Sequence, residues 1–223
     1  MISGLRQSIM MSIESARADG WATCDASIEE ILEAVGRHAV TVLPTRRGDP
    51  MVGVLRPRAP LDAHPNSLSS HYGLEELPPH TDGAHHREPP DLVVLQATQV
   101  SRCPTTLWRP AQSNPTAKQR ESLNCGVFLV GDGRQSFYSH VLDRDGRARF
   151  DPVCMRPVDP LARFASEWIK EQASEAVPHF WSNVGQSLLI DNRQTLHGRS
   201  RVPSSEDREL RRVMIRWDSN ASL

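Results

Sequence analysis

The sequence predicts a mainly β fold with flanking helices, a double-stranded β-helix of the jelly-roll type. Short runs rich in Val, Leu and Ile recur along the chain, and Pro and Gly bound them, as is typical of jelly-roll strands. Helical spacing of apolar residues occurs near the N-terminus and in two later segments. A chain of 223 residues is a usual length for one barrel, so we expect a single domain over 1–223, in which a helical N-terminal segment, residues 1–37, packs on the barrel.

Two helices are expected before the first strand. Over residues 4–18, apolar side chains recur at the spacing that places them on one face of a helix. The second helix begins at Ser27, which forms with Glu30 the S-x-x-E pattern of a capping box, and it ends near Gly36.

The first strands follow these helices. Segments 39–43 and 51–55 are short β-forming runs, and 91–99 is the next clear strand. The segment 56–79 is rich in Pro, Ser and Asn, which predicts a loop over the mouth of the site.

The second half of the chain is expected to contain both helices and strands. Asp159 and Pro160 mark the start of a helix on the outside of the barrel, since Pro is favoured at the first helical position. The other expected elements are a short helix over 117–123, strands over 126–130 and 136–142 followed by a turn at 143–146, and strands over 187–191 and 211–217.

The composition argues against several classes of protein. The formal net charge is −1, so no global basic field attracts nucleic acid or an anionic membrane surface. No apolar run approaches the ~20 residues that cross a bilayer, and the first residues lack the basic and apolar regions of a signal peptide. We therefore expect a cytoplasmic protein without a nucleic-acid or membrane partner. The four cysteines are scattered without C-x-x-C spacing, which predicts free thiols.

Three residues have the types and spacing of metal ligands. In a β-strand, side chains at i and i+2 project from the same face, so His80 and Asp82 can reach one metal while Thr81 points away. His197, from a distant strand, completes a set of two imidazoles and one carboxylate. Such a facial triad leaves coordination positions of Fe(II) open for other molecules, as in the sites of non-heme iron oxygenases.

The last predicted strand carries a basic pattern. Alternation places Arg212 and Arg216 on one face together with Met214, so two guanidinium groups point toward the same interior. Arg212 could pair with a carboxylate of the core. A buried guanidinium without a counter-charge is costly, however, so the arrangement favours an anionic ligand beside Arg212. For Arg216, pairing with a carboxylate such as Asp191 or Asp218 stays open as an alternative to binding a substrate anion.

These motifs, in this order, resemble the Fe(II)/2-oxoglutarate-dependent dioxygenases of the taurine dioxygenase and clavaminate synthase type, a cupin-like superfamily. The resemblance spans residues 70–217. By its motifs, it implies that His80, Asp82 and His197 bind iron and that Arg212 holds the distal carboxylate of 2-oxoglutarate. Thr106, in the T-L-W of the chain, corresponds to a threonine that helps to bind this co-substrate, and Arg216 to a position that contacts an anionic group of the substrate.

The resemblance also implies an activity. Such an oxidoreductase uses Fe(II), 2-oxoglutarate and O2 to hydroxylate or otherwise oxidise an unactivated C–H bond, and it releases succinate and CO2. Arg216 favours a small anionic or amino-acid-like substrate, and His85, in the unusual Gly83-Ala84-His85-His86 stretch, is a further candidate contact. Gly185-Gln186 departs from the Gly-Asp common in the family, and the chain is shorter than typical members.

Two other classes of protein remain as alternatives. The string from His80 to His86 superficially resembles motifs of metal-dependent hydrolases, although it lacks the order H-x-H-x-D-H. A non-catalytic, cupin-like barrel that binds a small acid is the second, because a fold does not guarantee an activity. Metal identity and turnover of 2-oxoglutarate distinguish these alternatives from an oxygenase.

Overall fold

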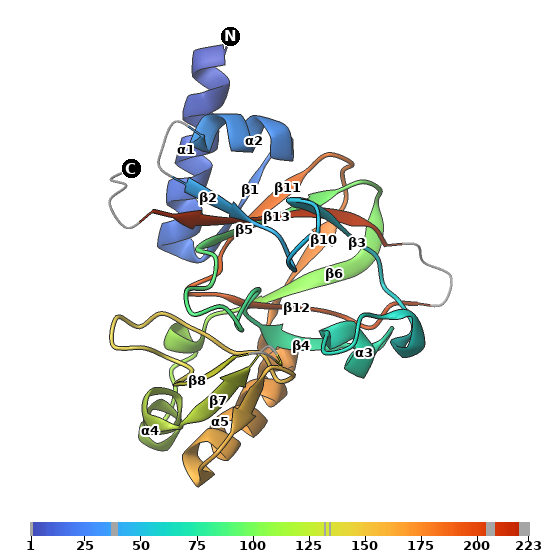
Figure 1. Ribbon diagram of the computed structural model, residues 1–223. Helices are drawn as coiled ribbons and strands as arrows, with labels where there is room; N and C mark the ends of the chain where they lie inside the picture. Colours follow the sequence, from blue (N-terminus) through green and yellow to red (C-terminus); the bar gives the residue numbers. More distant parts are fainter. Residues whose placement is uncertain (1, 37–39, 132, 134, 204–207, 219–223) are drawn as a thin grey trace.

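Two antiparallel sheets form the centre of the molecule (Figure 1). The computed structural model describes residues 2–36, 40–131, 133, 135–203 and 208–218. The larger sheet has the strand order β1-β11-β5-β13-β2, and β3 also pairs with β13. Its strands are β1 (Trp21–Cys24), β2 (Val40–Leu43), β3 (Val52–Leu55), β5 (Leu92–Ala97), β11 (Ser187–Asp191) and β13 (Leu210–Trp217).

The second sheet has four strands in the order β10-β6-β12-β4. Its strands are β4 (Leu77–His80), β6 (Ser101–Trp108), β10 (Val177–Trp181) and β12 (Leu196–Arg199). Side chains from both sheets share one buried cluster, which includes Val93, Leu95, Leu107, Trp181, Ile190 and Met214. The space between the sheets is therefore a packed interior, as expected for a mainly β jelly roll.

The N-terminal helices pack against the larger sheet. They are α1 (Ile2–Asp19) and α2 (Ile28–Val35), and the capping box of Ser27 and Glu30 at the start of α2 is confirmed. Ile9 and Ile13 of α1 and Ile31 of α2 are buried in one cluster with residues of β5, β11 and β13. The two helices therefore cover the face of the larger sheet that points away from the interior. Burial of each such side chain contributes about 1.5–3 kcal/mol to the free energy of unfolding.

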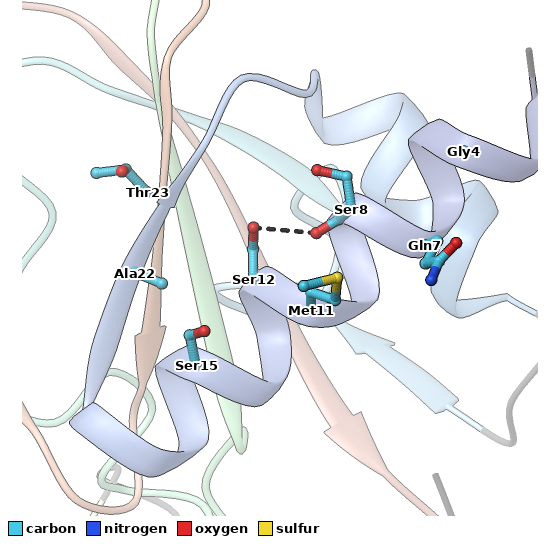
Figure 2. A pocket seen from close by; sticks show the side chains of 8 residues that line it. All are labelled: Gly4, Gln7, Ser8, Met11, Ser12, Ser15, Ala22 and Thr23. Carbon is cyan, nitrogen blue, oxygen red and sulfur yellow. Dashed lines mark hydrogen bonds between the residues drawn. The ribbon is translucent and has the colours of Figure 1, made fainter.

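An open hollow of about 510 Å³ lies between α1 and β1 (Figure 2). Its lining is mostly small or polar: Gly4, Gln7, Ser8, Met11, Ser12, Ser15, Ala22 and Thr23. The hydroxyl of Ser12 donates to the carbonyl of Ser8 at 3.1 Å, within the helix itself. The predicted metal ligands do not belong to this lining.

The chain between β6 and β10 forms a separate layer. It contains η2 (Pro110–Gln112), α4 (Ala117–Cys125), β7 (Phe128–Gly131), β8 (Ser136–Ser139), β9 (Met155–Pro157), α5 (Pro160–Glu171) and η3 (Gln172–Glu175). The predicted start of α5 is confirmed, because Asp159 caps the helix and Pro160 is its first residue. None of the described helices combines the length and the apolar character needed to cross a membrane.

Several elements differ from the sequence-based expectation. The loop predicted over 56–79 contains η1 (Pro60–Asp62), a short helix α3 (Leu68–Tyr72) and all but the last residue of β4. Strand β2 begins at Val40, and Ala39 lies outside the described residues. The strand expected to carry His197 is β12, whereas β1, β6, β9 and β10 were not predicted. They are short or polar, and their strand character depends on pairing with distant partners.

Candidate metal centre

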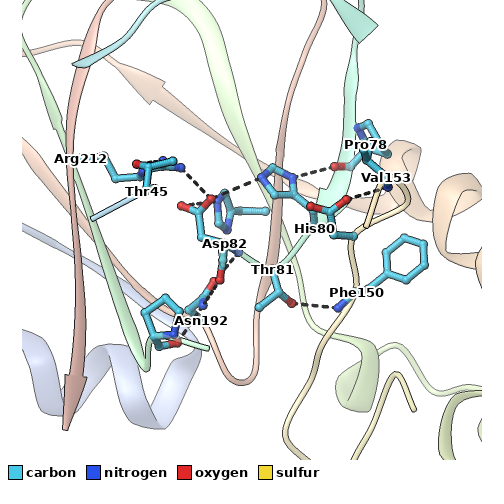
Figure 3. Close-up of polar contacts among 12 residues, drawn as sticks. Thr45, Pro78, His80, Thr81, Asp82, Phe150, Val153, Asn192 and Arg212 are labelled. Carbon is cyan, nitrogen blue, oxygen red and sulfur yellow. Dashed lines mark hydrogen bonds and ion pairs between the residues drawn. The ribbon is translucent and has the colours of Figure 1, made fainter. Parts of the chain in front are cut away.

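The three predicted ligands meet at one end of the four-stranded sheet. His80 is the last residue of β4, and His197 of β12 is its direct cross-strand partner, with ring centroids 4.6 Å apart. Contrary to the prediction, Asp82 lies not on the strand but in the turn that follows it. Thr81 does point away: its amide and its hydroxyl bind the backbone of Phe150 at 2.6 and 3.1 Å (Figure 3).

The geometry of the cluster fits a metal ion. One ligand atom of each residue lies within 4.8 Å of the others, and all three side chains are buried. Nε2 of His80 is 3.9 Å from one carboxylate oxygen of Asp82, and Nε2 of His197 is 3.6 Å from the other. Within the described part of the chain, Asp82 Oδ2 has no hydrogen-bond partner. A buried oxygen of this kind, facing imidazole nitrogens, is satisfied by a divalent cation.

The protonation states also suit a metal. The carbonyl of Pro78 lies 3.0 Å from Nδ1 of His80, which favours the proton on Nδ1 and leaves Nε2 as the ligand atom (Figure 3). Burial, and then the neighbouring His197, lower the pKa of His80 to about 3, so its imidazole is neutral. Burial alone raises the pKa of Asp82, but Arg212 and the two imidazoles together lower it well below its usual range. The carboxylate is therefore ionised.

Arg212 lies directly beside the ligands. One of its nitrogens donates to Asp82 Oδ1 at 2.7 Å, and the other donates to the hydroxyl of Thr45 at 2.7 Å (Figure 3). The arginine side chain is only 11% exposed, so this guanidinium belongs to the interior, as predicted. Thr45 was not predicted, because nothing in the loop after β2 marks it as a partner of a residue on β13.

The structure does not bring Thr106 to the ligands. In β6, Leu107 pairs with His197 and Thr106 with Gly198, so alternation turns the side chain of Thr106 to the opposite face. A Cβ added to Gly198 would lie 2.8 Å from the Thr106 hydroxyl, which places this hydroxyl against the β12 backbone. A contact of Thr106 with a co-substrate stays a prediction.

Thr105 shares the interior face instead. Its hydroxyl accepts hydrogen bonds from Trp181 Nε1 at 3.2 Å and from Arg208 at 2.8 Å. Arg208 is itself buried. The T-T-L-W motif therefore places its first threonine inside, which only the register of β6 could reveal.

Arg216 and His85, the predicted substrate contacts, have partners of their own. Arg216 is 3.8 Å from Glu88, with a third of its side chain exposed. The alternative that Arg216 pairs with a carboxylate is confirmed, but this carboxylate is Glu88 and not Asp191 or Asp218. His85 stacks on His86 in the loop that carries Glu88. Because Glu88 lies near Arg216, this loop lies beside the end of β13.

Arg149 was not predicted, and it holds this loop from outside. Its guanidinium donates to the carbonyls of Ala84, His86 and Arg87 at 2.6–2.8 Å. Arg199 likewise donates to backbone carbonyls, those of residues 73 and 75, at 2.8 and 2.7 Å. Backbone carbonyls carry no sequence signal, so these contacts could not be predicted.

Comparisons with solved structures confirm the fold. An asparagine oxygenase in complex with Fe(II), 3-hydroxyasparagine and succinate superposes with a TM-score of 0.71, at 17% identity, over 95% of this chain and 79% of that one. PvcB from Pseudomonas aeruginosa superposes with a TM-score of 0.67, at 16% identity, over 96% of this chain and 81% of that one. For the non-heme iron oxygenase OrfP in complex with Fe and alpha-ketoglutaric acid, the TM-score is 0.59 and the identity 22%, over 78% of this chain and 59% of that one. No family model and no curated protein matches the chain.

Proposed function

We propose that the protein is an Fe(II)- and 2-oxoglutarate-dependent dioxygenase that hydroxylates or otherwise oxidises a C–H bond of a small molecule. The observation that carries this proposal is the buried convergence of His80, Asp82 and His197, with a carboxylate oxygen left for a metal. Three protein ligands leave positions for other molecules. Iron bound there with 2-oxoglutarate and O2 supplies the oxidising chemistry, with release of succinate and CO2.

Arg212 is the proposed anchor of the co-substrate. Its planar guanidinium can bind a carboxylate through two parallel hydrogen bonds. It already lies within 2.7 Å of Asp82, so an anion held by it is adjacent to the metal ligands. Thr45, hydrogen-bonded to the same guanidinium, is a better supported second contact than Thr106. Buried apolar side chains around the interior exclude water from this position.

An amino acid is the proposed class of substrate. The solved structures with this fold include an asparagine oxygenase with a hydroxyasparagine and OrfP with a hydroxyarginine. In this chain, Arg216 lies four residues beyond Arg212 on the same face of β13 and faces Glu88 at 3.8 Å. A guanidinium and a carboxylate at that distance suit the two charges of a free amino acid. His85, in the loop that carries Glu88, is a further proposed contact.

The first experiment is an anaerobic titration of metal-free protein with Fe(II) and then 2-oxoglutarate. The expected result is the visible charge-transfer band of chelated 2-oxoglutarate, which Asp82→Ala and His197→Ala abolish. O2-dependent succinate release is then measured with L-asparagine, L-arginine and other amino acids. A folded protein that binds Zn(II) but gives no band with Fe(II) would instead support a metal-dependent hydrolase or a non-catalytic barrel.

A further inference from the structure

The loop that begins with Asp82 has no regular structure of its own. Residues 82–90 form turns and bends between β4 and β5. At Gly83 the backbone takes a φ of +65°, and a Cβ added there would lie 2.8 Å from the ring of Pro90. The two ends of the loop are therefore in contact, and the metal-binding carboxylate projects from one of them.

One buried side chain binds both ends of this loop. The Asn192 side chain accepts from the amide of Asp82 at 3.0 Å and donates to the carbonyl of Asp82 at 3.0 Å (Figure 3). Its second N–H donates to the carbonyl of Pro90 at 2.8 Å. Asn192 is fully buried, so these three hydrogen bonds form without competition from water.

The pattern of these bonds fixes the backbone of Asp82. Its N–H and its C=O are bound by one amide group, as a neighbouring strand would bind them in a ladder. The backbone amide of Asn192 also donates to the carbonyl of Asp91 at 2.9 Å, which ties the loop end to the start of β5. Asn192 lies five residues before His197 in the turn between β11 and β12. A single segment thus carries one metal ligand and holds the backbone of another.

We propose that Asn192 is a positioning residue of the metal centre, which aims the carboxylate of Asp82 before a metal arrives. This inference rests on the proposed function, because it concerns the same metal ligands. A residue that orients a ligand raises metal affinity, whereas a residue that merely fills the loop contributes to stability alone. Metal affinity and stability must therefore be measured separately.

The test uses two variants of Asn192 and one control. Asn192→Ala removes all three hydrogen bonds, while Asn192→Asp keeps the size and replaces the two donors by an acceptor that faces two carbonyls. Thr195→Val is the control, because Thr195 is fully buried in the same turn and its hydroxyl binds the carbonyl of Gly20 at 3.0 Å. The control loses one buried hydrogen bond but no contact with the loop over 82–90.

Metal-free proteins are titrated with Co(II), and its visible absorption reports binding. We expect both Asn192 variants to bind Co(II) about 10–100-fold more weakly than the wild type, as is typical when a residue that supports a metal ligand is lost. Thr195→Val should bind Co(II) with the affinity of the wild type, even if its melting temperature falls as much as that of the Asn192 variants. In metal-free protein, amide hydrogen exchange over 82–90 should be faster in the Asn192 variants and unchanged in the control.

Other results would overturn the inference. Folded Asn192 variants with wild-type Co(II) affinity would do so, as would an affinity that falls with melting temperature in all three variants. Failure of both Asn192 variants to fold would assign Asn192 a purely structural role. If the wild type itself does not bind Co(II), the proposed function fails, and this outcome is distinct from a failure of the inference about Asn192.

Discussion

Replacing Arg212 by Met tests the electrostatics of the centre most directly. The guanidinium lies 2.7 Å from Asp82, and the two side chains are 11% and 8% exposed. Met retains much of the apolar volume but leaves an ionised carboxylate buried without its cation. Removing one partner of a buried ion pair costs about 3–5 kcal/mol of the free energy of unfolding.

Urea denaturation of metal-free protein measures this loss, and the chain offers a matched control. Arg216→Met is the same substitution four residues later on the same face of β13. Its ion pair with Glu88 is longer, at 3.8 Å, and the arginine is 32% exposed. An exposed pair of this kind contributes at most about 1 kcal/mol. Arg212→Met should therefore lower the free energy of unfolding several times more than Arg216→Met does.

Saturation with Co(II) adds a second arm to the experiment. A divalent ion on Asp82 supplies the positive charge that Arg212→Met has removed, so the difference in stability from the wild type should shrink when the metal is bound. A loss no larger than that of Arg216→Met in the metal-free protein would refute the reasoning. It would mean that the buried carboxylate does not depend on Arg212 for its charge.

Three further predictions concern pH, thiols and strand packing. The pKa of His80 is about 3 in the folded protein and 6.5 in the unfolded chain, so between these pH values the unfolded state binds more protons. The free energy of unfolding of metal-free protein should therefore rise across this window by up to about 1.4 kcal/mol per pH unit. The variant His80→Gln should lack this pH dependence. Among the four cysteines, Cys125 alone is exposed, and burial raises the pKa of the Cys154 thiol. A thiol reagent should therefore modify only Cys125 in the native protein. Rapid reaction of all four cysteines would contradict the structure. In Gly198→Ala, the new Cβ would lie 2.5 Å from the carbonyl of Leu77 and would force β12 away from β4. We expect the free energy of unfolding to fall by about 1–3 kcal/mol and Co(II) to bind more weakly. A melting temperature and a Co(II) affinity equal to those of the wild type would contradict this prediction.

The candidate metal ligands could be selected from the sequence because their chemistry is carried by residue type and order. The structure brings His80, Asp82 and His197 together in a buried cluster that could hold a metal, and their role as ligands stays a prediction. The reason given for Asp82 was nevertheless wrong, since the strand ends at His80 and a turn, not alternation, brings the carboxylate to the site. The turn depends on Asn192, more than a hundred residues away in the sequence.

Local interactions were predictable in the fold as well. The helix starts at Ser27 and Asp159 were predicted because a capping residue and its partners lie within one turn of chain. The face on which Thr105 or Thr106 points depends instead on how β6 pairs with β12. A shift of one residue in that register exchanges the two faces, and no pattern within the T-T-L-W motif determines it.

The pairing of β6 with β10 has a consequence for how this chain can vary. These two strands are antiparallel neighbours, although residues 109–176 separate them in the sequence. The intervening layer thus behaves as an insertion between two strands that pair with each other. Through Phe150 and Arg149 this layer also binds the loop that carries Asp82. A change in this layer therefore reaches the loop that carries Asp82 without altering β4 and β12, the strands that carry His80 and His197.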